Sequence, residues 1–262
     1  MNSSLISKYI PLNTIIHNLD PRVKLFFVIC YFIDVFIAHS VGELLILSLF
    51  LVLAIILSKT NIAFLIDSVK AILLLIIFTS LVHLIFNKSG NIIFEFYAFK
   101  IYSGAFYGIA LITVRFVLVV MMMVVFMGTT SPSDITHAIE KSLGFLKKIG
   151  IPISTFALVL SISLRFIPTI LEETNRIINA QVSRGSDFNE GTLIQKTKKF
   201  IPILIPLFIG TLKRADELAT AMEVRGYSTT TIRSRYKELK YNKLDYLSYM
   251  LIILTTIFIV IM

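Results

Sequence analysis

The stretch AFYGIALITVRFVLVVMMMVVFM fills positions Ala105–Met127 and carries one charged residue, Arg115. A mainly apolar run of about 20 residues is long enough for a helix to cross the hydrocarbon core of a bilayer. Every backbone N–H and C=O group inside that core must be paired within the protein, so the run is expected to be a helix. This stretch therefore predicts an integral membrane protein.

Apolar runs of the same kind recur on both sides of this stretch. Only 16% of the 262 residues are charged, against about 25% in an ordinary soluble domain. No strand patterns stand out. We therefore predict an all-α integral membrane protein with about five transmembrane helices. The other four candidate spans are Val23–Ala38, Leu44–Ser58, Ala71–Phe86 and Tyr246–Met262.

The distribution of basic residues predicts the orientation of the chain. Residues 140–245 hold 17 Lys and Arg against 10 Asp and Glu, which is seven of the nine net positive charges. Loops rich in Lys and Arg stay in the cytoplasm. We expect residues 1–127 to hold four spans, 128–242 a cytoplasmic domain and 243–262 the last span, with the N-terminus inside and the C-terminus outside. The basic charge suits lipid headgroups, and no nucleic-acid partner is predicted.

The cytoplasmic segment should contain three helices. In TTSPSD, Ser131 is a candidate N-cap, Pro132 fits the first helical position, and Asp134 completes a capping box. This first helix is predicted to end near Lys148. The second should cover Ile153–Ser183 and the third Pro202–Val224, with a polar loop and a basic stretch between them. The second helix exceeds the thickness of the hydrocarbon, so we expect it to lie obliquely or along the membrane surface.

The second and third cytoplasmic helices form a repeat. A shift of 41 positions superimposes the pattern L-x8-A-x3-R-G, aligning Leu171 with Leu212, Ala180 with Ala221, Arg184 with Arg225 and Gly185 with Gly226. In one copy, helix capping explains an Arg-Gly end. Two copies favour a second role, because an exposed guanidinium can form a bidentate pair with a carboxylate of a partner. Two similar ends suit a partner with two similar grooves.

The remaining polar residues offer little chemistry. Arg115 lies within a predicted span, and Asp34 of the first span is one candidate partner for it. We favour structural pairing or snorkelling of Arg115 over a role in a substrate pathway. The four histidines are scattered and Cys30 is the only cysteine, so no metal site is predicted. The carboxylates Glu172, Glu173, Asp216 and Glu217 lie beside basic residues on helices and are interpreted as solvated or paired, not catalytic.

Four stretches resemble the transmembrane T component of energy-coupling factor (ECF) importers, the EcfT/CbiQ family. They are HNLDPRVKL at positions 17–25, TTSPSD at 129–134, LRFIPTILEETNRIINAQVSRG at 164–185 and IPLFIGTLKRADELATAMEVRGY at 205–227. The resemblance covers nearly the whole chain, and the two Arg-Gly helix ends are its most diagnostic part. Ser183 matches the family's small residue before the arginine, whereas Val224 is larger than the common Ala.

The resemblance implies a non-catalytic scaffold in the bacterial cell membrane. Its partners would be two P-loop ATPase subunits, a small membrane subunit that binds a vitamin or metal ion, and the lipid membrane. ATP and Mg²⁺ would sit on the ATPases, and this chain would bind no cofactor. The residues expected to bind the ATPases are Ala180, Ser183, Arg184, Gly185, Ala221, Val224, Arg225 and Gly226. The residues expected to bind the substrate-binding subunit are Phe156, Leu160, Leu164, Ile167, Leu171, Ile205, Phe208 and Leu212.

Two other classes of protein compete with this interpretation. A self-sufficient permease would draw on Arg115 and Asp34, but few other polar residues lie in the spans. A membrane-embedded enzyme would need clustered Asp or His at a membrane face, and the sequence shows none. The chain also lacks the G-x-x-x-x-G-K-[ST] stretch of a P-loop, so it is not expected to hydrolyse ATP itself.

Overall fold

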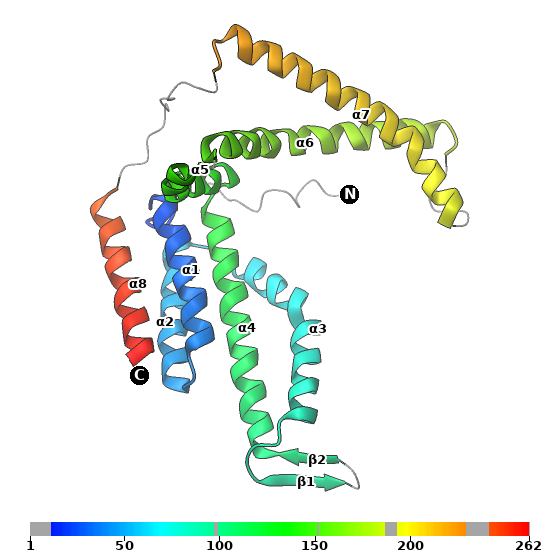
Figure 1. Cartoon of the computed structure of the whole chain (residues 1–262). Helices are drawn as coiled ribbons and strands as arrows, with labels where there is room; N and C mark the ends of the chain where they lie inside the picture. The colour runs from blue at the N-terminus through cyan, green and yellow to red at the C-terminus, as the bar shows by residue number, and fades with distance from the viewer. Residues whose placement is uncertain (1–11, 97–98, 151, 187–192, 229–240, 262) are drawn as a thin grey trace. The chain divides into compact units, whose positions relative to one another are not determined.

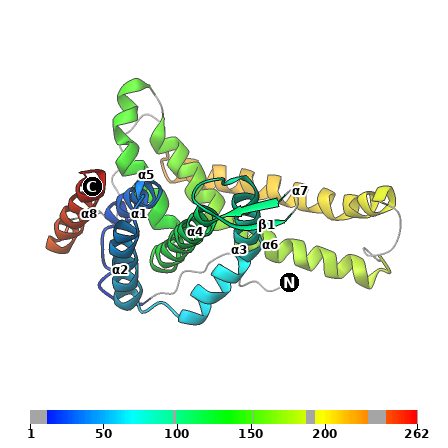
Figure 2. The same ribbon diagram turned by 90° about the horizontal axis from the view of Figure 1, so that it is seen from below.

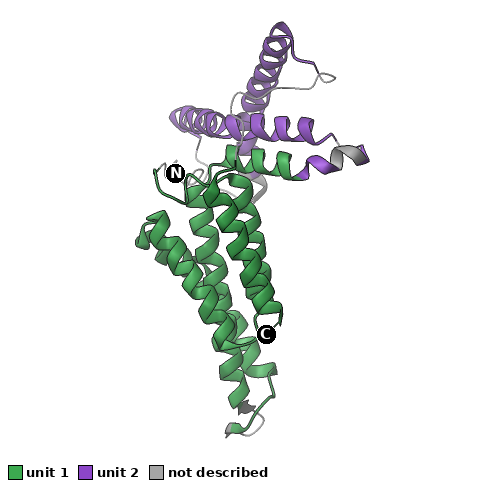
Figure 3. Ribbon diagram, turned by 90° about the vertical axis from the view of Figure 1, so that its left-hand side faces the viewer, with its two compact units in different colours: residues 1–142, 239–262 green, residues 143–238 purple. Residues whose placement is uncertain are grey.

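The computed structural model describes residues 12–96, 99–150, 152–186, 193–228 and 241–261. The chain divides into two compact units, coloured separately in Figure 3. The first comprises residues 1–142 and 239–262, and the second residues 143–238. Each unit is described by itself.

The first unit is a bundle of long helices: α1 (Pro21–Ile37), α2 (Val41–Ser58), α3 (Ile62–Phe86), α4 (Ser103–Thr129) and α8 (Lys243–Ile261). Helix α1 contacts α2, α4 and α8, while α3 packs along α4 (Figures 1 and 2). Tyr31, Leu47, Met122 and Ile252 lie in the buried core that joins α1, α2, α4 and α8. The outward apolar side chains, such as Leu74 of α3 at 83% exposure, suit contact with lipid.

Among the residues that the structure describes, five helices are long and apolar enough to cross a membrane: α2, α3, α4, α8 and α6 (Ile153–Ser183) of the second unit. The predicted first span is α1, whose 17 residues lie at the lower end of the usual range of about 17–25. The five spans predicted from the sequence thus correspond to α1, α2, α3, α4 and α8. Helix α6 meets the same criterion of length and composition, although we expected it to lie obliquely or along the surface.

A β-hairpin joins α3 to α4, where the sequence analysis predicted no strand. Strands β1 (Ile92–Phe96) and β2 (Phe99–Tyr102) pair antiparallel, with Glu95 opposite Lys100 and Phe96 opposite Phe99. Both strands are rich in aromatic and β-branched residues, which fit a pleated sheet. The expectation was wrong here because these short runs adjoin long apolar stretches that dominate the pattern.

Helix α5 (Pro132–Ser142) begins with the predicted capping box. The backbone N–H of Asp134 donates to Ser131 Oγ at 3.2 Å, and Ser131 Oγ donates to Asp134 Oδ2 at 2.7 Å. The turn continues to Ile149 as a 3₁₀-helix, η2 (Leu143–Ile149), in place of the single α-helix predicted to Lys148. Because α5 packs on α1, it belongs to the first unit, whereas we had grouped it with the segment after residue 127.

The second unit is built on two long helices, α6 and α7 (Leu193–Val224), which contact each other. Helix α6 has the bounds predicted from the sequence. Helix α7 begins nine residues before the predicted start at Pro202, so Leu193–Lys199 is helical and not a basic stretch outside the helix. Proline is a common signal of a helix boundary, but both Pro202 and Pro206 are inside α7. Of the predicted loop, residues 187–192 lie outside the described residues.

Candidate functional site

Both repeated helices end in the same hydrogen-bonded turn. In α6 the N–H of Gly185 donates to the carbonyl of Val182 at 2.9 Å, and that of Ser186 donates to Gln181 at 3.0 Å. In α7 Gly226 donates to Glu223 and Tyr227 to Met222, both at 2.9 Å. This is the Schellman pattern of a helix C-terminus. The four pairs of residues are related by the same shift of 41 positions as the sequence repeat.

The two glycines carry the backbone conformation that closes each turn. Gly185 has φ of 87° and Gly226 has φ of 75°, in the left-handed region that other residues adopt at a cost. Helix capping therefore accounts fully for the glycines. The arginine side chains are not needed to close the turn, because backbone groups alone close it.

Every predicted ATPase-binding residue is exposed at one of these two ends, which we call the α6 tip and the α7 tip. The α6 tip comprises Ala180, Ser183, Arg184 and Gly185, and the α7 tip Ala221, Val224, Arg225 and Gly226. Val224 is 83% exposed beside Arg225. Among the described residues no ion pair engages either guanidinium. Each tip thus presents a cation beside small or apolar side chains, a surface suited to an acidic groove.

The residues predicted to bind a membrane subunit are divided between the earlier parts of α6 and α7. Phe156, Ile167 and Leu171 on α6, and Ile205, Phe208 and Leu212 on α7, are exposed. Leu160 and Leu164 are half-buried. Phe208 is the most exposed of the eight at 64%. So much exposed apolar surface in a folded helix pair is typical of a surface that contacts lipid or another protein.

One contact between α6 and α7 was not identified as a site from the sequence. Arg214 Nη2 donates to Glu173 Oε2 at 2.8 Å, which forms an ion pair between the two helices. Glu173, which the sequence predicts to be solvated or paired, is thus paired. The shift of 41 positions could have found its partner, because it aligns Glu173 with Arg214.

Arg115 does not pair with Asp34 in the described part of the chain. Its Nη2 donates to the carbonyl of Ala38, which follows the last residue of α1, and Asp34 Oδ2 accepts a hydrogen bond from Thr256 of α8. The guanidinium therefore satisfies a carbonyl at the end of α1, where the helix dipole also favours a cation. This structural role agrees with the interpretation that we favoured.

The HNLDPRVKL segment (positions 17–25) links three parts of the first unit, which was not predicted from the sequence. The N–H of Asp20 donates to Oδ1 of the fully buried Asp245 at 2.9 Å, linking the start of α1 to α8. Lys24 Nζ donates to the carbonyls of His17 and Thr129, both at 3.0 Å, and so reaches the end of α4. The guanidinium of Arg22 pairs with Asp20 and lies 4.0 Å from the centre of the Tyr241 ring. These contacts fix the position of the α4–α5 junction relative to α1 and α8.

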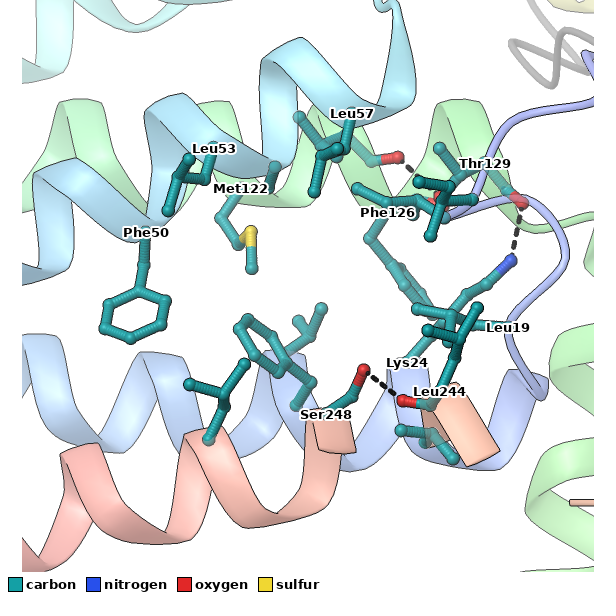
Figure 4. Close-up of a pocket in the computed structure, with 18 of the residues that line it drawn as sticks. Leu19, Lys24, Phe50, Leu53, Leu57, Met122, Phe126, Thr129, Leu244 and Ser248 are labelled. Atoms are coloured by element: carbon teal, nitrogen blue, oxygen red, sulfur yellow. Dashed lines mark hydrogen bonds between the residues drawn. The ribbon is translucent and has the colours of Figure 1, made fainter. Parts of the chain in front are cut away.

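A cavity of about 330 Å³ lies beside this segment in the first unit (Figure 4). Its walls are almost entirely apolar and come from α1, α2, α4, α8 and the chain before α1; they include Phe50, Leu53, Met122, Phe126 and Leu251. Lys24, Thr129 and Ser248 are the polar residues of the lining. Such a lining suits hydrocarbon and offers few groups to a polar solute.

No group of three or more His, Cys, Asp or Glu side chains able to hold a metal ion occurs among the residues that the structure covers. The absence of a metal site on this chain stays a prediction.

Known proteins match the sequence of this chain over nearly its whole length. Residues 12–237 match the cobalt transport protein family CbiQ. The chain is 40% identical to the energy-coupling factor transporter transmembrane protein EcfT of Lactococcus lactis subsp. cremoris over 260 residues, covering 99% of this chain and 98% of the relative. It is 39% identical to the protein of the same name from Bacillus subtilis over 245 residues, covering 94% and 92%. For the one from Streptococcus equi subsp. equi the identity is 42% over 258 residues, covering 98% and 96%.

The chain therefore belongs to the CbiQ family, among the transmembrane components of energy-coupling factor transporters. It is a multi-pass membrane protein of a transport system. The apolar helices α2, α3, α4 and α8 also indicate a membrane protein.

Proposed function

We propose that the chain is a non-catalytic scaffold that couples ATP hydrolysis by two partner ATPases to the reorientation of a substrate-binding membrane subunit. The observation that carries the proposal is the pair of equivalent tips. Two arginines related by one sequence shift end two helices with the same turn and are exposed without an ion pair among the described residues. One partner with two similar grooves, or two similar partners, would use such a pair.

Each tip would dock in one ATPase, Arg184 in one and Arg225 in the other. A guanidinium that pairs with a desolvated carboxylate in a groove contributes strongly to binding, whereas an exposed surface pair contributes little. Val224 and Val182, both exposed, would pack against the groove around the cation. ATP-driven closure of the ATPase dimer would then change the separation of the tips. ATP and Mg²⁺ belong to the ATPases in this scheme.

The exposed apolar residues of α6 and α7 would contact the subunit that binds the vitamin or metal ion. Phe208 and Ile205 are central to this surface because they are exposed on α7 well before its tip. Movement of the helices would shift this surface and tilt the bound subunit in the membrane.

The positive-inside rule gives the orientation of the scheme. The second unit and the N-terminus would lie in the cytoplasm, where the ATPases are, and the C-terminus outside. The excess of Lys and Arg over residues 140–245 supports this orientation.

The test is a purification of the tagged chain from bacterial membranes, beside the double variant Arg184→Ala/Arg225→Ala, with identification of the co-purifying proteins. We expect two P-loop ATPases and a small membrane protein with the wild type, and loss of the ATPases from the variant. Two ATPases retained by the double variant would contradict docking through the arginines. A chain that purifies alone and transports solute in liposomes would instead be a permease.

A further inference from the structure

The ion pair between α6 and α7 joins equivalent positions of the repeat. Glu173 and Arg214 are separated by the same 41 positions that relate Arg184 to Arg225. The same shift relates the capping turns at the ends of the two helices. The ion pair therefore joins two positions that the repeat makes equivalent.

The pair also lies at the same distance from each tip. Glu173 precedes Arg184 by eleven residues, and Arg214 precedes Arg225 by eleven. At a rise of about 1.5 Å per residue, each tip is roughly 16 Å along its helix from the contact. If the two helices are held together at this pair, the helix segments between the pair and each tip are equally long.

The surroundings restrict how the two helices approach each other. A Cβ atom at Gly210 would come within 2.9 Å of Glu173 Oε1, so the absence of a side chain there leaves room for the carboxylate. The guanidinium of Arg214 also lies 6.0 Å from the ring centre of Phe166, two helical turns before Glu173 on α6. The side chains of Glu173 and Arg214 are only 28% and 29% exposed, so water screens the pair less than a fully exposed one.

We propose that Glu173 and Arg214, with Gly210, form the pivot about which α6 and α7 move when the tips are displaced. They are positioning residues, since they would touch neither nucleotide nor transported substrate. The opposite charges hold equivalent positions together, which two identical charged residues could not do. The helices are held together at one point. A change in the distance between the tips therefore changes the angle at which the apolar parts of the helices cross. This inference rests on the proposed coupling function.

The pivot predicts uncoupling without disassembly. The assembled complex, reconstituted in proteoliposomes, would carry Glu173→Gln, Arg214→Gln, or the exchange Glu173→Arg/Arg214→Glu. We expect the single variants to retain all subunits and ATP hydrolysis, and to lower substrate uptake per ATP by about fivefold or more, in the range of allosteric couplings. The exchange variant should restore most of this ratio, because it rebuilds the pair with its charges reversed.

Two further variants separate the pivot from general effects on stability. Gly210→Ala adds a residue with higher helix propensity but pushes on the Glu173 carboxylate, so uptake per ATP should fall with no loss of thermal stability. Lys70→Gln removes the exposed Asp67–Lys70 pair of α3 and should leave the ratio unchanged.

Unchanged uptake per ATP in both single variants would overturn the pivot, as would loss of the ATPases from Glu173→Gln, which would make the pair an assembly contact. Failure of the coupling function itself is recognised separately. In that case the wild-type chain would bind no ATPases, or the Arg184→Ala/Arg225→Ala variant would keep them.

Discussion

At the scale of single residues, arginine and glycine have separate tasks at the two tips. The glycine adopts the positive φ that closes the Schellman turn, while the arginine side chain projects from that turn without an ion pair among the described residues. The glycine therefore shapes the end of the helix, and the neighbouring arginine presents a positive charge to a partner. Substitutions of the two should have different consequences.

Arg225 should be sensitive to a change that keeps its charge. Arg225→Ala is expected to weaken ATPase binding by more than about 1–2 kcal/mol, because it leaves the partner's carboxylate unpaired. Arg225→Lys keeps the charge but loses the planar guanidinium fork. Its affinity for the ATPases should therefore lie between those of the wild type and Arg225→Ala. Titration of the purified chain with the ATPases measures both. Equal affinity of wild type and Arg225→Ala would contradict the assignment.

Asp245 should matter for stability and not for docking. Its carboxylate accepts the N–H groups of Asp20 and Asn242, at 2.9 and 2.7 Å. Asp245→Ala leaves these donors without their acceptor, and a buried unsatisfied group costs about 1–3 kcal/mol. Thermal unfolding in detergent should show a lower Tm. Asp67→Ala, at an exposed pair, is the control and should change stability by no more than about 0.5 kcal/mol. An unchanged Tm for Asp245→Ala would show that the link between α1 and α8 is dispensable.

At the scale of elements, the local signals of capping decided which helices could be predicted. The bounds of α6 followed from the sequence because Pro152 precedes its start and Gly185 closes its end. The start of α7 was misplaced because Pro202 is also a helix-boundary signal, and only the surrounding structure shows that α7 continues through it. The hairpin of β1 and β2 was missed because its strands are short.

Contacts between distant residues were harder to predict than the elements. Asp20 and Asp245 lie 225 positions apart, and no pattern in one sequence connects them. The helix ends at the tips could be predicted because each capping signal is local and repeated. The pair of Glu173 and Arg214 stands between these cases, since the repeat relates the two positions but only the packing of α6 on α7 brings them together.

The apolar part of α7 should bind the membrane subunit independently of the tips. Phe208→Asp introduces a charge on an exposed apolar surface, and burial of an unpaired charge on binding is costly. Co-purification should show loss of the substrate-binding subunit while both ATPases remain. Asp216→Asn, an exposed change on the same helix, serves as the control. Retention of all subunits by Phe208→Asp would show that this part of α7 does not contact the substrate-binding subunit.

At the scale of the whole molecule, the charge distribution and the order of the helices predict the orientation of the chain. Ser89, between α3 and β1, should lie outside, and Ser183 at the α6 tip should lie in the cytoplasm. In a Cys30→Ser background, Ser89→Cys should react with a membrane-impermeant maleimide on intact cells. Ser183→Cys should react only after permeabilisation. The opposite labelling pattern would place the tips away from the ATPases and contradict the scheme.

The central claim is that the two tips dock in two ATPases, and photo-crosslinking tests it most directly. A photoreactive amino acid would replace Ser183 or Val224 in cells that make the complete complex, with Leu74 as the control because its 83% exposure equals that of Val224. We predict crosslinks from both tips to P-loop ATPases and none from position 74. Crosslinks from the tips to lipid alone, or to no ATPase, would contradict the account and leave the Arg-Gly ends as helix caps.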